Sequence, residues 1–318
     1  MSNVLPIITP ESFDMAAYMR ESEPKVKVLS PLAWRDALVQ STRAGESSEL
    51  TGARLPWAKT HDMIRFRGGE MSLWQGMNGH GKSQLVGQVM TGFSAQDEPS
   101  CIASFEMKPL ANLKRMLRQV AMTATPSESA ADRFVKWLDK RMWFYDQMGS
   151  VRPEMVYAVI RYCAEQLRVK HFMVDSLMKC VQGEDDYNGQ KAFVDQLTSL
   201  ARDYNIHIHL VHHVRKSENE DRPPGKYDAK GTGAIADLVD NFLTVWRNKP
   251  KERAVEIELR KNNCVSEDTA AKPDSMIICD KQRHGDWEGR INLWFNRPSL
   301  QYTGDRSGRP LEMIGDLL

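Results

Sequence analysis

From about residue 55 onward, the hydrophobic positions follow two spacings in turn. Short, nearly continuous apolar runs are typical of buried strands, and longer segments with apolar residues every three or four positions are typical of helices. The pattern predicts strands at 71–75, 101–105, 142–145, 171–175 and 206–211, and helices at 82–93, 109–122, 127–140, 155–167 and 193–204. Strands and helices that alternate in this way build an α/β fold with a mainly parallel, twisted sheet flanked by helices.

The two ends of the chain depart from this alternation. Four β-rich segments predict antiparallel strands at the far edge of the sheet, at 242–246, 255–260, 276–279 and 291–295. Before them, residues 214–232 predict a long polar loop. Residues 1–54 show little periodicity apart from an amphipathic pattern at 31–39, which favours a short helix. We therefore expect an N-terminal arm with a linker helix over 1–54 and one domain over 55–318.

Composition narrows the class of protein. The 318 residues carry 43 Lys+Arg against 42 Asp+Glu, and 41% are hydrophobic, which is typical of a globular protein. No apolar run reaches the roughly 18 residues of a membrane span, and the start lacks the pattern of a secretory signal. We expect a cytoplasmic protein without a membrane partner. A pI near 7.7 means that any nucleic-acid contact must be local.

Cysteine and histidine spacing gives little reason to expect a structural metal. The five cysteines are scattered and never form CxxC, so we interpret them as small core residues. Four histidines fall within residues 207–213. Strand alternation places His207 and His209 on one face, but no Asp, Glu or Cys is spaced to complete a site with them.

Residues 76–83 carry the most specific motif. They match GxxxxGK[ST] between a predicted strand and a predicted helix, which is the context that phosphate binding requires. Glycines let backbone N–H groups point at phosphates, and the helix N-terminus favours negative charge. The residues expected to bind nucleotide are Gly76, Asn78, Gly79, His80, Gly81, Lys82, Ser83 and Gln84. The motif predicts a P-loop that binds ATP.

Hydrolysis of ATP requires a magnesium ligand and a group that acts on water. Asp175 ends the apolar run at 171–175, the position of a magnesium-binding carboxylate, and the Ser83 hydroxyl is expected to share the Mg²⁺ ion. Glu106 directly follows the strand predicted at 101–105, at the carboxyl edge of the sheet. We expect Glu106 to be the general base.

Four segments resemble the DnaB-like replicative helicase family. Phe105-Glu106-Met107 and the helix after it resemble the family's S-L-E-M segment, whose Glu is the catalytic base. His212-His213-Val214-Arg215 resembles the segment whose last strand residue reads the γ-phosphate, which maps to His213. In the family these two segments belong to the same ATP site.

The other two segments carry the family's DNA and interface functions. Residues 230–237 resemble the R-x-S-G-x-I-x-x-x-A-D region, whose loop holds single-stranded DNA in the channel of a ring. The residues that this implies for DNA contact are Lys230, Gly231, Thr232 and Gly233, with Arg215 and Lys216 from the polar loop. Residues 280–285 resemble K-Q-R-N-G with His284 in place of Asn, which implies that Lys281 and Arg283 reach the neighbouring subunit's γ-phosphate.

The resemblance spans about residues 55–302 and is similar to the helicase domain of phage primase-helicases and Twinkle. It implies a RecA-like, Mg²⁺- and ATP-dependent motor that forms a homo-oligomeric ring, a hexamer in the family. Such a ring translocates on single-stranded or forked DNA in a bacterial or phage-infected cell, with a separate primase, loader or polymerase as partner. The family's linker helix packs on the adjacent subunit, a role that Trp34, Leu38 and Val39 can fill.

Two other functions stay open. A RecA-like recombinase or strand-annealing ATPase shares the P-loop, Glu106 and Asp175, although the residues at 281–283 favour a helicase. A helicase-loading adaptor that binds nucleotide without useful turnover is suggested by the lack of room before residue 55 for a primase-associated domain. The presence of both Glu106 and Arg283 argues against the adaptor.

Overall fold

The computed structural model describes residues 7–8, 31–36, 39, 51–183, 185–213, 221–223 and 232–315. Their strands form one sheet in the order β1-β4-β3-β5-β6-β2-β7-β8-β9-β10. The strands are β1 (Ile7–Ile8), β2 (Met71–Gly76), β3 (Ser100–Ser104), β4 (Met142–Tyr145), β5 (His171–Asp175), β6 (His207–His213), β7 (Asn241–Arg247), β8 (Ser275–Gln282), β9 (Gly289–Asn296) and β10 (Gln301–Thr303). Pairing is parallel from β1 to β7 and antiparallel from β7 to β10, so the predicted α/β fold is confirmed.

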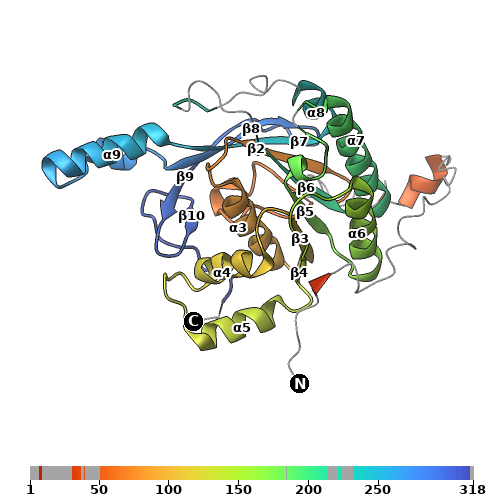
Figure 1. Ribbon diagram of the computed structural model, residues 1–318, viewed down its shortest axis with the longest axis horizontal. Coiled ribbons are helices and arrows are strands. Elements are labelled where there is room, and N and C mark those ends of the chain that lie inside the picture. Colours follow the sequence, from red (N-terminus) through yellow and green to blue (C-terminus); the bar gives the residue numbers. More distant parts are fainter. Residues whose placement is uncertain are drawn as a thin grey trace.

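Helices cover both faces of this sheet (Figure 1). The helices of the described residues are η1 (Pro31–Trp34), η3 (Ala58–Thr60), α3 (Lys82–Ser94), α4 (Pro109–Val120), α5 (Glu128–Leu138), α6 (Pro153–Gln166), η4 (Leu177–Lys179), α7 (Tyr187–Tyr204), α8 (Thr232–Leu238), α9 (Lys249–Asn262) and α10 (Glu267–Ala271). Helices α6, α7 and α8 share one hydrophobic cluster with the sheet, and α3, α4 and α5 share the other. Neighbouring strand residues such as Phe172 and Met173 therefore enter opposite clusters.

Local signals set many of the element ends. Proline lies in the first turn of α4, α6 and α9, where its missing N–H leaves no bond unmade. The Ser127 side chain accepts a hydrogen bond from the backbone N–H of Ala130 and begins α5. Asn205, in the left-handed conformation, ends α7 just before β6. These boundaries bring β2, β3, β5 and β6 to a common carboxyl edge, where the motif residues gather.

The strand predicted at 255–260 is wrong, because this segment lies within helix α9. Apolar and charged residues alternate there as in a strand, but the Asn248 side chain accepts a hydrogen bond from the Lys251 N–H (3.0 Å) and caps a helix. Ile257 and Leu259 are 52% and 46% exposed. The alternation therefore does not mark a buried face.

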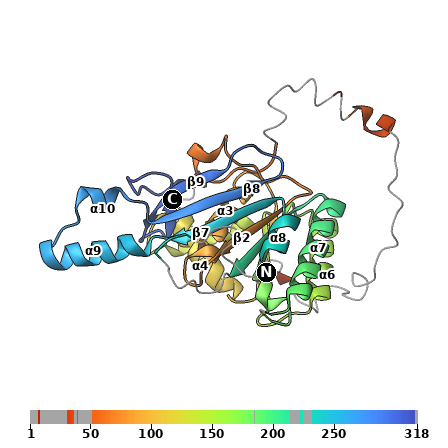
Figure 2. The same ribbon diagram turned by 90° about the horizontal axis from the view of Figure 1, so that it is seen from above.

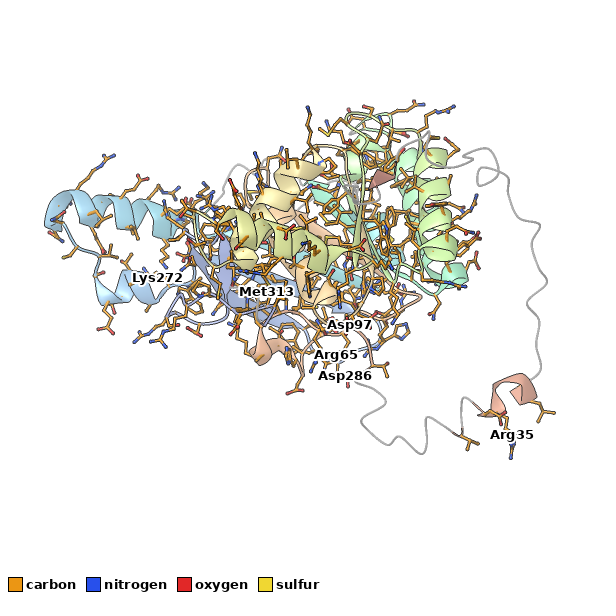
Figure 3. All side chains as sticks on the ribbon, turned by 90° about the horizontal axis from the view of Figure 1, so that it is seen from below. Arg35, Arg65, Asp97, Lys272, Asp286 and Met313 are labelled. Atoms are coloured by element: carbon orange, nitrogen blue, oxygen red, sulfur yellow. The ribbon has the colours of Figure 1, made fainter. Side chains whose placement is uncertain are left out.

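Helices α9 and α10 form a hairpin that projects from the body of the domain (Figures 1 and 2). The Glu258 carboxylate accepts hydrogen bonds from Ser266 and from the Thr269 hydroxyl (2.7 Å), which ties the two helices together. Figure 3 labels Lys272 beside α10. Cys264 lies exposed in this hairpin, so the interpretation of all five cysteines as core residues fails for Cys264 and holds for the four that are buried.

The N-terminal arm is described only in part. Residues 31–34 form η1 and the next two residues continue a helical turn, so the predicted helix over 31–39 is partly seen. Figure 3 shows Arg35 on this helix, apart from the body of the domain. Strand β1 adds to the sheet beside β4, and Ala53 is already buried and pairs with Phe66. Of the helices in the described residues, none is long and apolar enough to cross a membrane.

Candidate nucleotide site

The P-loop leaves the carboxyl end of β2 and enters α3, as its sequence predicts. Gly76 has φ +157°, and a Cβ there would lie 2.4 Å from the Val245 carbonyl oxygen. Gly81 has φ +81°, and a Cβ there would lie 2.2 Å from the Tyr302 hydroxyl. Any side chain at Gly81 therefore meets both backbone strain and a collision. The absence of a Cβ at these two glycines lets the loop pack closely against β7 and β10.

Lys82 is buried within the P-loop, with 3% of its surface exposed. Its Nζ donates to the carbonyl oxygens of Gly76 and Met77, both at 2.8 Å. Burial lowers the pKa of Lys82 to about 8, while Asp175 and Glu106 oppose the fall. A cation held in this way is short of negative charge, which favours a phosphate group beside it.

Asp175 ends β5 and is 1% exposed. Its Oδ2 accepts a hydrogen bond from the Ser104 hydroxyl (3.3 Å), whereas its buried Oδ1 has no hydrogen-bond partner among the described residues. Burial raises the pKa of Asp175, and the nearby Ser83 hydroxyl opposes the rise. A buried carboxylate oxygen without a partner, close to a serine hydroxyl, is the hard oxygen set that Mg²⁺ prefers.

Glu106 lies beside Asp175, just beyond β3. It accepts a hydrogen bond from the Ser176 hydroxyl (2.8 Å), and its Oε1 lies 3.4 Å from Nε2 of His213. The neighbouring His213 lowers the pKa of Glu106 to about 2, against the effect of burial and with help from the Ser176 hydroxyl. One ligand atom each of Glu106, Asp175 and His213 lies within 4.8 Å of the other two. The structure thus brings together three residues that the sequence placed on three different strands.

These groups open into a pocket of about 1240 Å³. Of the residues predicted to bind nucleotide, the pocket is lined by Asn78, Gly79, Gly81, Lys82, Ser83 and Gln84. Gly76 and His80 instead support the loop. The Gly76 carbonyl accepts a hydrogen bond from Lys82, and the His80 Nδ1 accepts one from the backbone N–H of Arg247 (3.1 Å). The site therefore combines a phosphate-binding loop, a buried cation and two carboxylates in one place.

Comparison with known proteins agrees with this geometry. Residues 61–219, half of the chain, match the sequence family described as AAA domain. The chain belongs to the AAA domain family. No curated protein matches its sequence.

Among solved structures, this AAA domain is similar to an isolated ATPase domain, with 16% identity, a TM-score of 0.65 and coverage of 85% of this chain and 98% of that one. It is also similar to a DnaB-like replicative helicase studied with primase, with 15% identity and a TM-score of 0.66, covering 89% of this chain and 68% of that one. At these identities the likeness shows the shared fold. The predicted RecA-like fold of DnaB-like helicases is confirmed.

The AAA domain also lines its pocket with C-terminal residues that the sequence motifs did not indicate. Phe295 and Tyr302 contribute rings 5.1 Å apart, and Arg297 and Arg247 add positive charge. Gln88 of α3 exchanges two hydrogen bonds with the Tyr302 backbone (2.7 and 2.8 Å), which fastens β10 over the P-loop. No motif marks these residues; Arg247 ends β7, which lies beside the P-loop strand, and the other three belong to the antiparallel end of the sheet.

The predicted interface residues lie at the other edge of the sheet. Strand β8 is antiparallel to β7, and its end at Gln282 pairs with Asn241 at the start of β7. Lys281 and Arg283 therefore lie near the start of β2, whereas the P-loop follows its end, a strand length of about 17 Å away. The structure does not bring Arg283 and Lys82 together within one chain.

Most of the predicted DNA-contacting residues cannot be placed. Lys230, Gly231, Arg215 and Lys216 lie outside the described residues. Thr232 and Gly233 begin α8, and Gly233 is exposed.

The buried histidines His207 and His209 of β6 and His171 of β5 have a structural role. The Trp74 indole donates to Nδ1 of His209 (3.2 Å), and Nε2 of His209 lies 3.2 Å from Nδ1 of His171. His207 bonds the Ser72 hydroxyl (2.7 Å), and burial lowers its pKa to about 3. Burial lowers the pKa of His171 and His209 as well. Neutral rings account for these side chains within the core, and His207 and His209 each have hydrogen-bond partners at both ring nitrogens.

Proposed function

We propose that this AAA domain is an ATP-dependent replicative DNA helicase motor that forms a ring and translocates on single-stranded DNA. The observation that supports this most directly is that one chain carries two groups of candidate ATP-site residues at opposite edges of its sheet. Lys82, Asp175 and Glu106 gather at the carboxyl edge of the sheet, while Arg283 lies at the amino edge. A site that contains both requires a second copy of the chain, as in a ring of identical subunits.

In this proposal, each of the motif residues has its own part in hydrolysis. The P-loop N–H groups and Lys82 hold the phosphates, and Ser83 with the unpartnered oxygen of Asp175 would hold Mg²⁺. Bound there, Mg²⁺ neutralises charge that develops on the phosphate oxygens. Glu106, kept ionised by His213 and Ser176, accepts a proton from the attacking water. Arg283 of the neighbouring copy stabilises the charge of the transition state.

The DNA-binding part of the proposal rests on the residues before and within the start of α8. Lys230, Gly231, Thr232 and Gly233, with Arg215 and Lys216, would contact backbone phosphates, which carry no sequence information. One similar structure is of a DnaB-like helicase with its primase interactions. By analogy, we propose that this chain has a separate primase, loader or polymerase as its partner and that it assembles as a hexamer.

Two assays test the proposal together. We expect ATP hydrolysis to be stimulated by single-stranded DNA, and a forked duplex to be unwound when ATP and Mg²⁺ are present. Stimulated hydrolysis with strand pairing in place of unwinding would select the recombinase. Absence of turnover with and without DNA would select the adaptor and remove the helicase.

A further inference from the structure

Lys179 lies in the nucleotide pocket, although no sequence motif indicates it. The pocket is lined by Lys179 together with Lys82, Glu106 and the P-loop. Lys179 ends η4, the short helix that follows Asp175. Its side chain forms no ion pair or hydrogen bond with another described residue, and Lys179 is only partly exposed. A half-buried ammonium group with no acceptor among the described residues favours the binding of an anion beside it.

The backbone of Lys179 is bonded on both sides. Its N–H donates to the carbonyl oxygen of Ser176 (3.1 Å), and its own carbonyl oxygen accepts from the N–H of Val151 (2.8 Å). Leu177 and Cys180, which lie before and after it in the same turn, are fully buried in the hydrophobic core. The position of Lys179 in the pocket wall is therefore fixed by the fold, and only its side chain can adjust to a ligand.

The same segment carries two residues that belong to the candidate site. Asp175 is the carboxylate expected to bind Mg²⁺, and the Ser176 hydroxyl donates to Glu106 (2.8 Å). The pKa of Glu106 is lowered mainly by His213, and the charge of Lys179 contributes to the same effect. Lys179 therefore lies within electrostatic reach of the carboxylate where the attacking water is expected.

Two lysines of one chain reach this region from different strands. Lys82 follows β2 and Lys179 follows β5, and β6 lies between these two strands in the sheet. Burial lowers the pKa of Lys82 and the charge of Glu106 opposes the fall, so Glu106 lies within electrostatic reach of both lysines. A terminal phosphate carries about two negative charges at neutral pH. Bound by Lys82 and facing Glu106, it would therefore lie in the part of the pocket that Lys179 lines.

We infer that Lys179 is a further residue of the ATP site and that its ammonium group contacts the terminal phosphate beside Glu106. The inference rests on the proposed function, since it concerns the same nucleotide. Unlike Arg283, Lys179 belongs to the chain whose P-loop holds the nucleotide, so its contact requires no neighbouring subunit. ADP lacks the terminal phosphate, so this contact favours ATP over ADP. It also stabilises charge that develops on the phosphate oxygens during hydrolysis.

The first test measures nucleotide binding in the Glu106→Gln background, in which hydrolysis is slow. Titrations with ATP and with ADP, each in the presence of Mg²⁺, compare Glu106→Gln with the double variant Glu106→Gln/Lys179→Met. Methionine keeps the aliphatic length and removes the charge. We expect ATP binding to weaken roughly 10-fold or more, as for the loss of a hydrogen bond to a charged group, and ADP binding to stay nearly the same. Equal weakening of both nucleotides, or unchanged binding of ATP, would overturn the inference.

The second test measures hydrolysis with Glu106 intact. Lys179→Met should lower the rate at saturating ATP roughly 10- to 150-fold, and Lys179→Arg should recover part of it, because a guanidinium keeps the charge and donates to phosphate. Lys191→Met is the matched control, because Lys191 lies exposed on α7 and does not line the pocket, and it should behave as the wild type. Lys179→Gln takes the place of Lys179→Met if a thermal melt shows that the methionine variant is not folded.

The outcomes separate this inference from the proposed function. If Lys179→Met hydrolyses ATP and unwinds a forked duplex as fast as the wild type, the inference fails and the helicase proposal stands. A slower rate with an unchanged preference for ATP over ADP would mean that Lys179 acts only through Glu106, which also overturns the contact with phosphate. A wild-type protein that hydrolyses no ATP removes the proposed function, and the binding titrations still test the contact between Lys179 and the terminal phosphate.

Discussion

The charged side chains at the two edges of the sheet differ in how many of their partners lie within the same chain. At the carboxyl edge, Lys82, Asp175 and Glu106 gather at a large pocket, and one oxygen of Asp175 has no partner among the described residues. At the amino edge, the side chains of Lys281 and Arg283 are bound to carbonyl groups and to Asp240 of their own chain. Of the described residues that line the pocket, none comes from the amino edge.

The difference indicates which edge binds a ligand and which one assists it. At the carboxyl edge a ligand can still bind, since a buried cation and a buried carboxylate oxygen both lack a full set of partners among the described residues. Arg283 is 37% exposed beside the buried Asp240 carboxylate, so its guanidinium can contact a further anionic group from solvent while it keeps that partner. The amino edge is thus suited to meet a phosphate that another copy presents.

Arg283→Ala tests this comparison with the largest expected effect. The protein should still assemble and bind ATP, because the P-loop pocket is complete without Arg283. Its hydrolysis rate should fall roughly 10³- to 10⁵-fold, the contribution of such arginines in other P-loop enzymes. Turnover at saturating ATP, measured on a confirmed oligomer, checks this. A fully active variant would show that the amino edge has no part in catalysis.

Mixed assemblies extend the same test. Lys82→Ala subunits should be inactive alone, since they lose the cation that pairs with phosphate. Lys82 is also buried and holds two loop carbonyls, so a thermal melt must first show that the variant is folded. Mixed with Arg283→Ala subunits, they should regain part of the activity, because an intact P-loop can then face an intact Arg283. A mixture that stays inactive despite proven co-assembly would contradict shared sites.

Glu106→Gln isolates the chemistry at the carboxyl edge from binding there. The amide keeps a hydrogen-bond acceptor for Ser176 but cannot take a proton from water. We expect ATP affinity to be retained and the rate at saturation to fall roughly 10²- to 10⁴-fold. Single-turnover hydrolysis together with a binding titration separates the two quantities. A large loss of affinity with normal turnover would move Glu106 out of its role as base.

Much of the fold was predictable because its signals are local. The strand–helix alternation from β2 to β7 appears in the residues themselves, and the P-loop and the carboxylates follow from their positions at strand ends. The segment at 255–260 failed because alternation of apolar and charged residues predicts a strand only when one face becomes buried, and Ile257 and Leu259 remain exposed. The pattern gave no sign that this segment projects from the domain.

The rest of the site depends on contacts between distant segments. Tyr302 lies against Gly81 because β10 pairs with β9 as the last strand of the sheet, and no motif indicates that contact. The burial of Lys82 against loop carbonyls and the binding of Lys281 to α8 are likewise products of tertiary structure. The resemblance to family motifs implied a role for each residue, but it did not predict which groups the residue contacts in the structure.

Lys230→Ala has the smallest expected effect and tests the predicted contact between Lys230 and single-stranded DNA. A lysine that contacts one phosphate adds one released counterion, so its loss should lower the magnitude of the slope of log K against log salt by roughly one unit. Binding should weaken about equally for all sequences, because phosphate contacts read none. Titrations of fluorescent single strands at several salt concentrations measure both quantities, with Lys261→Met in the exposed part of α9 as the control of equal charge. Hydrolysis without DNA should survive, since Lys82 and Glu106 already line the pocket at the carboxyl edge. An unchanged salt slope combined with failed hydrolysis in the absence of DNA would assign Lys230 to the nucleotide and would remove its predicted role in DNA binding.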